Sequence, residues 1–177
     1  MGMNLINLDE KTRKFMLNEL EQDVASNKLY LSPRLNDAGR RNYENLLRSA
    51  IQKGDDVSLA NSLAGMFKDY EQRAKKSGGY TTAKVPITAS ETLAEGEFNR
   101  FYCRGVCRRA QEEGLDEVEV YRAKAVQNPR PESQVLVGSK IKADRLLHDL
   151  RTNIGVDTAL RVPAGPNSGL SIRLPQA

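Results

Sequence analysis

The stretch from Thr88 to Gly114, TASETLAEGEFNRFYCRGVCRRAQEEG, constrains the fold of this chain more than any other. Thr88 and Glu91 have the spacing of a capping box, and Ile87 before them suits a hydrophobic staple. An aromatic face and a row of arginines follow, and a glycine ends the stretch. This pattern predicts the longest helix of the protein.

Three earlier segments also have helical patterns, at residues 8–25, 38–53 and 57–76. Apolar residues recur in each at the spacing of one helix face. Asn36 or Asp37 suits an N-cap for the second segment and Asp55 or Asp56 for the third, and Gly54 stands where a C-terminal cap is expected. These segments predict a helical N-terminal part that packs on the central helix.

The third segment ends in QRAKKSGG, a basic run followed by two glycines. Lys and Arg suit the end of a helix because they interact favourably with its dipole. The same cluster is also compatible with a nucleic-acid patch. Gly78 and Gly79 mark the clearest internal boundary, and Pro86 limits residues 80–87 to an edge strand or an extended connector.

A mixed region follows the central helix. Residues 117–126 alternate in the manner of a strand, and residues 134–137, QVLV, suit a short second strand. Residues 141–153 predict a last helix that buries three leucines. Together with the N-terminal helices, this predicts an α+β fold that is mostly helical, with a long central helix and a small β element.

The last 22 residues, 156–177, contain too many prolines and glycines for a long helix. They nevertheless carry regularly placed apolar residues: Leu160, Val162, Leu170, Ile172 and Leu174. Ordering such a segment has an entropic cost that only docking can offset. We therefore expect an extended tail that docks on the chain's own surface or on a neighbouring subunit by strand addition. The predicted divisions are 1–79, 80–155 and 156–177.

Composition excludes several classes of protein. Hydrophobic residues make up 39% and charged residues 28%, which is typical of a globular chain. The net charge of +4 is only mildly basic and does not by itself indicate a DNA-binding protein. Two cysteines are too few for a disulfide framework, which favours a reducing compartment. We find no signal peptide and no apolar run long enough to span a membrane.

The central stretch carries its arginines one helical turn apart. Arg100, Arg104 and Arg108 share one face, and Arg109 adjoins them. Three interpretations are open: a phosphate-binding stripe, a protein interface with arginine anchors, or a solvated face with intrahelical pairs such as Glu97–Arg100. These four arginines are the candidate contacts with a partner or a phosphate.

Cys103 and Cys107 lie one turn apart on the same predicted helix. Zinc needs two further ligands, and the chain has only one histidine, His148, far away in sequence. A Cys–His catalytic pair would need that same histidine. We therefore interpret the cysteines as small packing residues and predict no catalytic residue, metal or cofactor.

Four segments carry a resemblance to a known group: AEGEFNRFYCRGVCRRA, EVYRAK, NPRPES and AGPNSGLSIRL. With them the chain resembles small proteins encoded among the head and neck genes of tailed bacteriophages and prophages. The resemblance covers most of residues 4–174 and carries over no catalytic or binding residue. It implies a role in the virion or in its assembly.

We therefore expect a non-enzymatic structural or assembly protein of a phage particle, made in the bacterial host cytoplasm. Its expected partners are other copies of itself or capsid, portal or neck proteins. The alternative is a basic nucleic-acid-binding or regulatory module that uses the arginine face of the central helix.

Overall fold

The computed structural model describes residues 2–155, 160–162 and 168–176. Its helices are α1 (Glu10–Ala25), α2 (Asp37–Lys53), α3 (Asp56–Ser62), α4 (Ala89–Glu112), α5 (Pro131–Leu136) and α6 (Ala143–Thr152). Its strands are β1 (Tyr70–Ala74), β2 (Tyr80–Lys84), β3 (Glu117–Arg122), β4 (Lys140–Lys142) and β5 (Leu170–Arg173). The predicted α+β fold, mostly helical and with a long central helix, is confirmed.

Side chains close the N-termini of the first three helices. Asp9 accepts a hydrogen bond from the backbone of Thr12 in α1, and Asn36 does the same for Gly39 in α2. Asp55 forms a full capping box with Ser58 at the start of α3. These bonds satisfy amide groups that a helix leaves unpaired at its start. The predicted caps at Asn36 and Asp55 are confirmed.

The predicted helix over 57–76 is wrong beyond Ser62. The side-chain amide of Asn36 donates to the carbonyls of Gly65 and Phe67, which holds the loop after α3 against the start of α2. From Tyr70 the chain pairs with β2 as an antiparallel hairpin, and glycines at positive φ form its turn. The apolar residues 63–67 resemble a helix stripe locally, but the hairpin pairing overrides that preference.

Two smaller predictions are also wrong. Thr88 makes no side-chain cap at α4, and Ile87 is fully exposed, so neither a capping box nor a staple starts this helix. Residues 134–137 are not a strand. Most of them belong to α5, which begins at Pro131, a residue whose fixed φ suits the first position of a helix.

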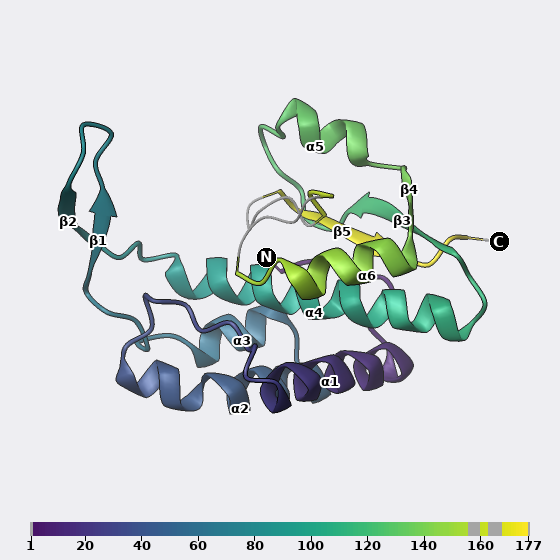
Figure 1. The fold of residues 1–177 in the computed structure, drawn as a ribbon, viewed down its shortest axis with the longest axis horizontal. Coiled ribbons are helices and arrows are strands. Elements are labelled where there is room, and N and C mark those ends of the chain that lie inside the picture. The colour runs from purple at the N-terminus through teal and green to yellow at the C-terminus, as the bar shows by residue number, and fades with distance from the viewer. Residues whose placement is uncertain (1, 156–159, 163–167, 177) are drawn as a thin grey trace.

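Helix α4 lies in the middle of the molecule (Figure 1). Helices α1 to α3 cover one side of it, and α6 with the three-stranded sheet covers the other. Gly105 allows α1 to approach closely, since a Cβ at this position would lie 2.6 Å from Met16 Cγ and 3.0 Å from the carbonyl of Thr12. The long helix is thus buried along most of its length.

The three-stranded sheet has the order β4-β3-β5, and both pairings are antiparallel. Strand β5 comes from the segment predicted as a docking tail, and it places Ile172 opposite Val120. Leu170, Ile172 and Val162 are buried, and Leu160 and Leu174 pack against the same core. Of the two docking modes expected, the structure has residues 170–173 docked on this chain's own sheet.

A single hydrophobic cluster runs from Leu5 near the N-terminus to Ile172 in β5. The N-terminal segment helps to close it, since Tyr121 donates to the carbonyl of Asn4 and the amide of Leu174 donates to Asn7. The predicted segments 1–79, 80–155 and 156–177 therefore contribute to one core. Residues 156–159, 163–167 and 177 of the tail lie outside the described residues.

Candidate functional site

Most of the predicted arginine row contacts neighbouring parts of the chain rather than solvent, and Arg104 is buried. Arg104 is only 4% exposed. Its guanidinium donates to Glu19 at 2.8 Å and to both carboxylate oxygens of Asp23, the shorter contact being 2.6 Å. Both acids belong to α1. The expectation that Arg104 contacts a partner or a phosphate is corrected, because its hydrogen-bonding groups are occupied within the chain.

Arg100 faces the other neighbour of α4. Its guanidinium donates to the backbone carbonyls of Leu150 and Asn153, at the end of α6. Carbonyls at a helix end lack intrahelical donors and carry partial negative charge, so a cation stabilises them. Arg100 therefore closes the C-terminus of α6. Its predicted pair with Glu97 is present at 3.9 Å.

Arg109 and Arg108 are less buried. Arg109 bonds to Asp9 at 2.6 Å and to Glu113 at 2.9 Å, which connects the start of α1 to the end of α4. Arg108 lies 4.0 Å from Glu19 and over the ring of Phe15, with 40% of its side chain exposed. Arg108 is thus the member of the row with the most surface left for a partner, and such a contact remains a prediction.

Glu19 is the centre of this charge network. It is fully buried, and Arg151 of α6 bonds to it beside Arg104 of α4. Burial by itself raises the pKa of Glu19, but the hydrogen bonds from Arg151 and Arg104 outweigh burial and keep that pKa below its ordinary value. One carboxylate therefore joins α1, α4 and α6. Sequence reasoning missed Glu19 and Asp23, although their spacing of four residues matches that of the arginines.

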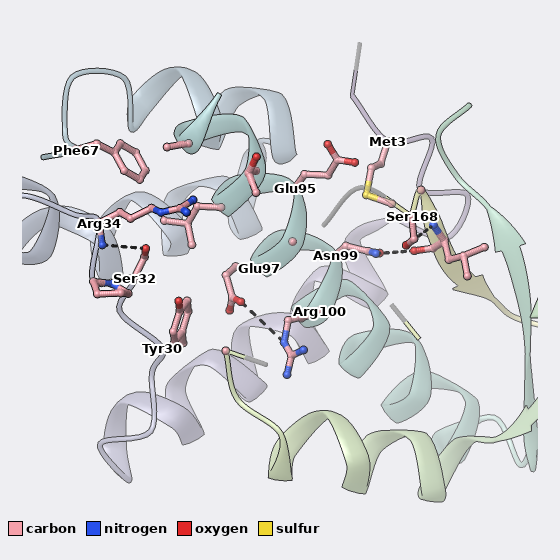
Figure 2. Close-up of a pocket in the computed structure, with 18 of the residues that line it drawn as sticks. Met3, Tyr30, Ser32, Arg34, Phe67, Glu95, Glu97, Asn99, Arg100 and Ser168 are labelled. Atoms are coloured by element: carbon pink, nitrogen blue, oxygen red, sulfur yellow. Dashed lines mark hydrogen bonds and ion pairs between the residues drawn. The ribbon is translucent and has the colours of Figure 1, made fainter. Parts of the chain in front are cut away.

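A pocket of about 410 Å³ opens beside the first half of α4 (Figure 2). Glu95, Glu97, Asn99 and Arg100 line it from α4. Tyr30, Ser32 and Arg34 line it from the linker between α1 and α2, and Met3 and Ser168 come from near the two chain ends. The pocket is thus built where segments distant in sequence meet, which no local motif predicts.

Glu97 is the chemically distinctive group of this pocket. Burial raises its pKa to about 7, against the opposing effect of Arg100 and Arg104. A carboxyl with this pKa can exchange a proton near neutral pH. The other charged groups nearby are already paired, Glu95 with Lys124 at 2.6 Å and Arg34 with Glu71 at 2.6 Å. The arrangement therefore places the exchangeable proton of Glu97 beside the guanidinium of Arg100.

The two cysteines are buried packing residues. Cys103 lies 3.6 Å from Asn99 and 3.8 Å from Ser171. Burial raises the pKa of Cys103 to about 12 and raises that of Cys107 well above its ordinary value. Both therefore stay protonated thiols, which are poor nucleophiles and poor metal ligands. His148 lies on the exposed side of α6.

Within the described ranges, no group of three His, Cys, Asp or Glu side chains is placed to hold a metal ion. The helices in that part of the chain also include none that is both long and apolar enough to cross a membrane.

Comparison with known proteins gives no relative from which a site could be transferred. No family model, no curated protein and no solved structure matches this chain.

Proposed function

We propose that this chain is a non-enzymatic structural or assembly protein of a tailed-phage particle. It acts through contacts with capsid, portal or neck subunits or with further copies of itself, and it resides in the virion after synthesis in the host cytoplasm. The resemblance of its sequence to head and neck proteins motivates this assignment. Of the groups that suggested chemistry, Arg100, Arg104, Arg109 and the two cysteines are occupied in holding the fold together.

The observation that carries the proposal is a groove at the base of the β1–β2 hairpin, in which exposed apolar side chains lie beside Lys68, Asp69 and Lys84. The groove has a volume of about 640 Å³ and is lined by Phe67, Tyr70, Val85, Pro86 and Ile87, among others. Ile87 is 99% exposed and Tyr70 is 55% exposed. Clustered exposed apolar side chains are typical of protein–protein contact sites, because leaving them in water is unfavourable.

The alternative, nucleic-acid binding through the arginine face of α4, has less support. A phosphate would have to displace Glu19 and Asp23 from Arg104 and the α6 carbonyls from Arg100. Removing an arginine from such buried partners leaves charges unpaired, which is strongly unfavourable.

Affinity capture from cells that co-express the tagged chain with capsid, portal and neck proteins of the encoding phage or prophage tests the proposal. We expect at least one of them to be retained, and Ile87→Asp to abolish retention. Val135→Asp is the matched control, because Val135 is 80% exposed on α5, away from the groove. Failure to retain any of these proteins, or equal retention by Ile87→Asp, would overturn the proposal.

A further inference from the structure

The excess positive charge of the chain is concentrated in one element. The chain has 27 Lys and Arg against 23 Asp and Glu. Residues 72–84, QRAKKSGGYTTAK, contain four of the basic side chains and no acidic one, so the remaining residues are balanced at 23 of each. The stretch consists of most of β1, the turn and β2. With Glu71 included, the hairpin from Tyr70 to Lys84 carries a charge of +3, most of the net charge of +4.

The hairpin extends away from the body (Figure 1). Every residue of 72–84 is exposed except Ala83, which is half-buried. Five residues per strand at roughly 3.3 Å each give the paired part a reach of about 16 Å. Arg73 pairs with Glu71 at 2.6 Å, whereas among the described residues no carboxylate lies within ion-pair distance of Lys75, Lys76 or Lys84. These ammonium groups therefore differ from the arginines of α4, which carboxylates and carbonyls already hold.

The strand register sorts the hairpin into two faces. Tyr70 lies opposite Lys84, and Ala74 lies opposite Tyr80, so both tyrosines are on one face. Glu71 lies on the other face and bonds to Arg34 of the body at 2.6 Å, which ties down the base of the hairpin. The tyrosine face remains free, and Tyr80 is 72% exposed near the tip.

We propose that the β1–β2 hairpin is an arm that binds double-stranded DNA. A cationic element whose one carboxylate, Glu71, is held at its base complements a phosphate backbone, and Lys75, Lys76 and Lys84 would supply the phosphate contacts. A two-stranded ribbon fits the major groove of B-form DNA, which is about 12 Å wide. The major groove of A-form RNA is too deep and narrow for it, which selects duplex DNA over duplex RNA.

This inference extends beyond the proposed assembly role and does not depend on it. The groove lies at the base of the hairpin and includes Lys84, whereas Lys75 and Lys76 lie at the far end of the hairpin. A variant that loses protein retention through Ile87→Asp is expected to keep its DNA affinity. The two activities can therefore fail separately.

Fluorescence anisotropy with a labelled random duplex of about 25 base pairs, between about 50 and 200 mM salt, tests the arm. We expect binding that weakens steeply with salt. The double variant Lys75→Ala with Lys76→Ala should lower the slope of log affinity against log salt by about 2, close to the 0.9 expected for each lost phosphate contact. Because both side chains are exposed, its thermal melting curve should match that of the unmodified chain.

Lys28→Ala with Lys53→Ala is the matched control, since it removes the same charge from exposed positions on the body. We expect its salt slope and affinity to equal those of the unmodified chain. Three results would each overturn the proposal: no duplex binding at about 50 mM salt, equal losses in both double variants, or tighter binding of single-stranded DNA or RNA of the same length. A fourth result would assign the arm to a protein partner instead: the unmodified chain binds no DNA but retains a phage protein, and the Lys75, Lys76 double variant fails to retain that protein.

Discussion

Helix α4 and the β1–β2 hairpin both carry clustered positive charge, but the two clusters differ in their exposure to solvent and in their partners. Arg104 lies in the interior between two carboxylates of α1. Lys75 and Lys76 stand in water at the far end of the hairpin. Charge of the same sign therefore stabilises the body in one case and is available to an outside polyanion in the other.

The difference lies in the partners rather than in the cations. A buried guanidinium needs compensating acids, and Glu19 and Asp23 supply them. The hairpin has no such acids beyond Glu71 at its base. Surplus charge with no internal partner is thus a better guide to a binding surface than a regular arginine row on a helix.

The largest effect that tests this comparison is expected for Arg104→Ala. The substitution leaves Glu19 and Asp23 buried near α4 without their main cation, which should lower the free energy of unfolding by about 3–5 kcal/mol. Urea denaturation measures it. Arg108→Ala is the control and should cost under about 1 kcal/mol, because its side chain is 40% exposed. Equal effects would mean that Arg104 is not the central cation of the network.

The docked strand β5 gives a second test. Ile172 is fully buried opposite Val120, so Ile172→Ala should lower the free energy of unfolding by about 2–5 kcal/mol. Leu174→Ala, just beyond the strand and only partly buried, should have a smaller effect. If Ile172→Ala is neutral by denaturation, residues 170–173 are not held in this sheet in solution.

Glu97 gives a pH test of the body. Its folded pKa of about 7 lies above the ordinary value of 4.5, so the folded state binds the proton more tightly than the unfolded state. The stabilisation of the folded state by this proton is complete below about pH 4.5 and is lost as the pH rises through about 7. The free energy of unfolding should therefore fall by about 2 kcal/mol between pH 5 and pH 7. Glu97→Gln keeps the neutral form at all pH values and should flatten this part of the profile. An equally steep profile in the variant would contradict the assignment.

The smallest effect is expected in the hairpin. Tyr80 is largely exposed and packs against no part of the core. Tyr80→Ala should therefore change the free energy of unfolding by less than about 0.5 kcal/mol. Chemical denaturation checks this value, and a loss comparable with that of Ile172→Ala would show that the hairpin belongs to the cooperative body.

Much of the helical framework was predictable from local signals. Periodic apolar residues placed α1, α2, α4 and α6 to within about two residues, and short polar side chains marked the caps at Asn36 and Asp55. An edge strand over 80–87 was one of the two forms predicted, but β1 was missed because residues 63–70 have helical periodicity, while the pairing of Tyr70 with Lys84 depends on residues 14 positions apart. Local pattern carries no information about such pairing.

The candidate site was less predictable. The arginine row was visible, but its surroundings were not, because Glu19 lies 85 positions from Arg104 and Asn153 lies 53 positions from Arg100. The pocket at Glu97 likewise forms only when the N-terminal segment, the α1–α2 linker and residues 168–170 of the tail meet at α4. Whether the arginines and Glu97 are exposed therefore depends on how these segments pack together in the folded chain.

The sequence by itself determined that residues 88–114 form the central helix and that Leu170–Leu174 must dock rather than remain free. Spacing and apolar content are sufficient for both conclusions, since helix periodicity and the unfavourable hydration of apolar side chains act locally. Only the tertiary structure decided that Arg104 is buried between carboxylates and that Lys75 and Lys76 have no carboxylate beside them among the described residues. That outcome depends on which carboxylates approach which cations, and the approach is set by packing between α1, α4 and α6.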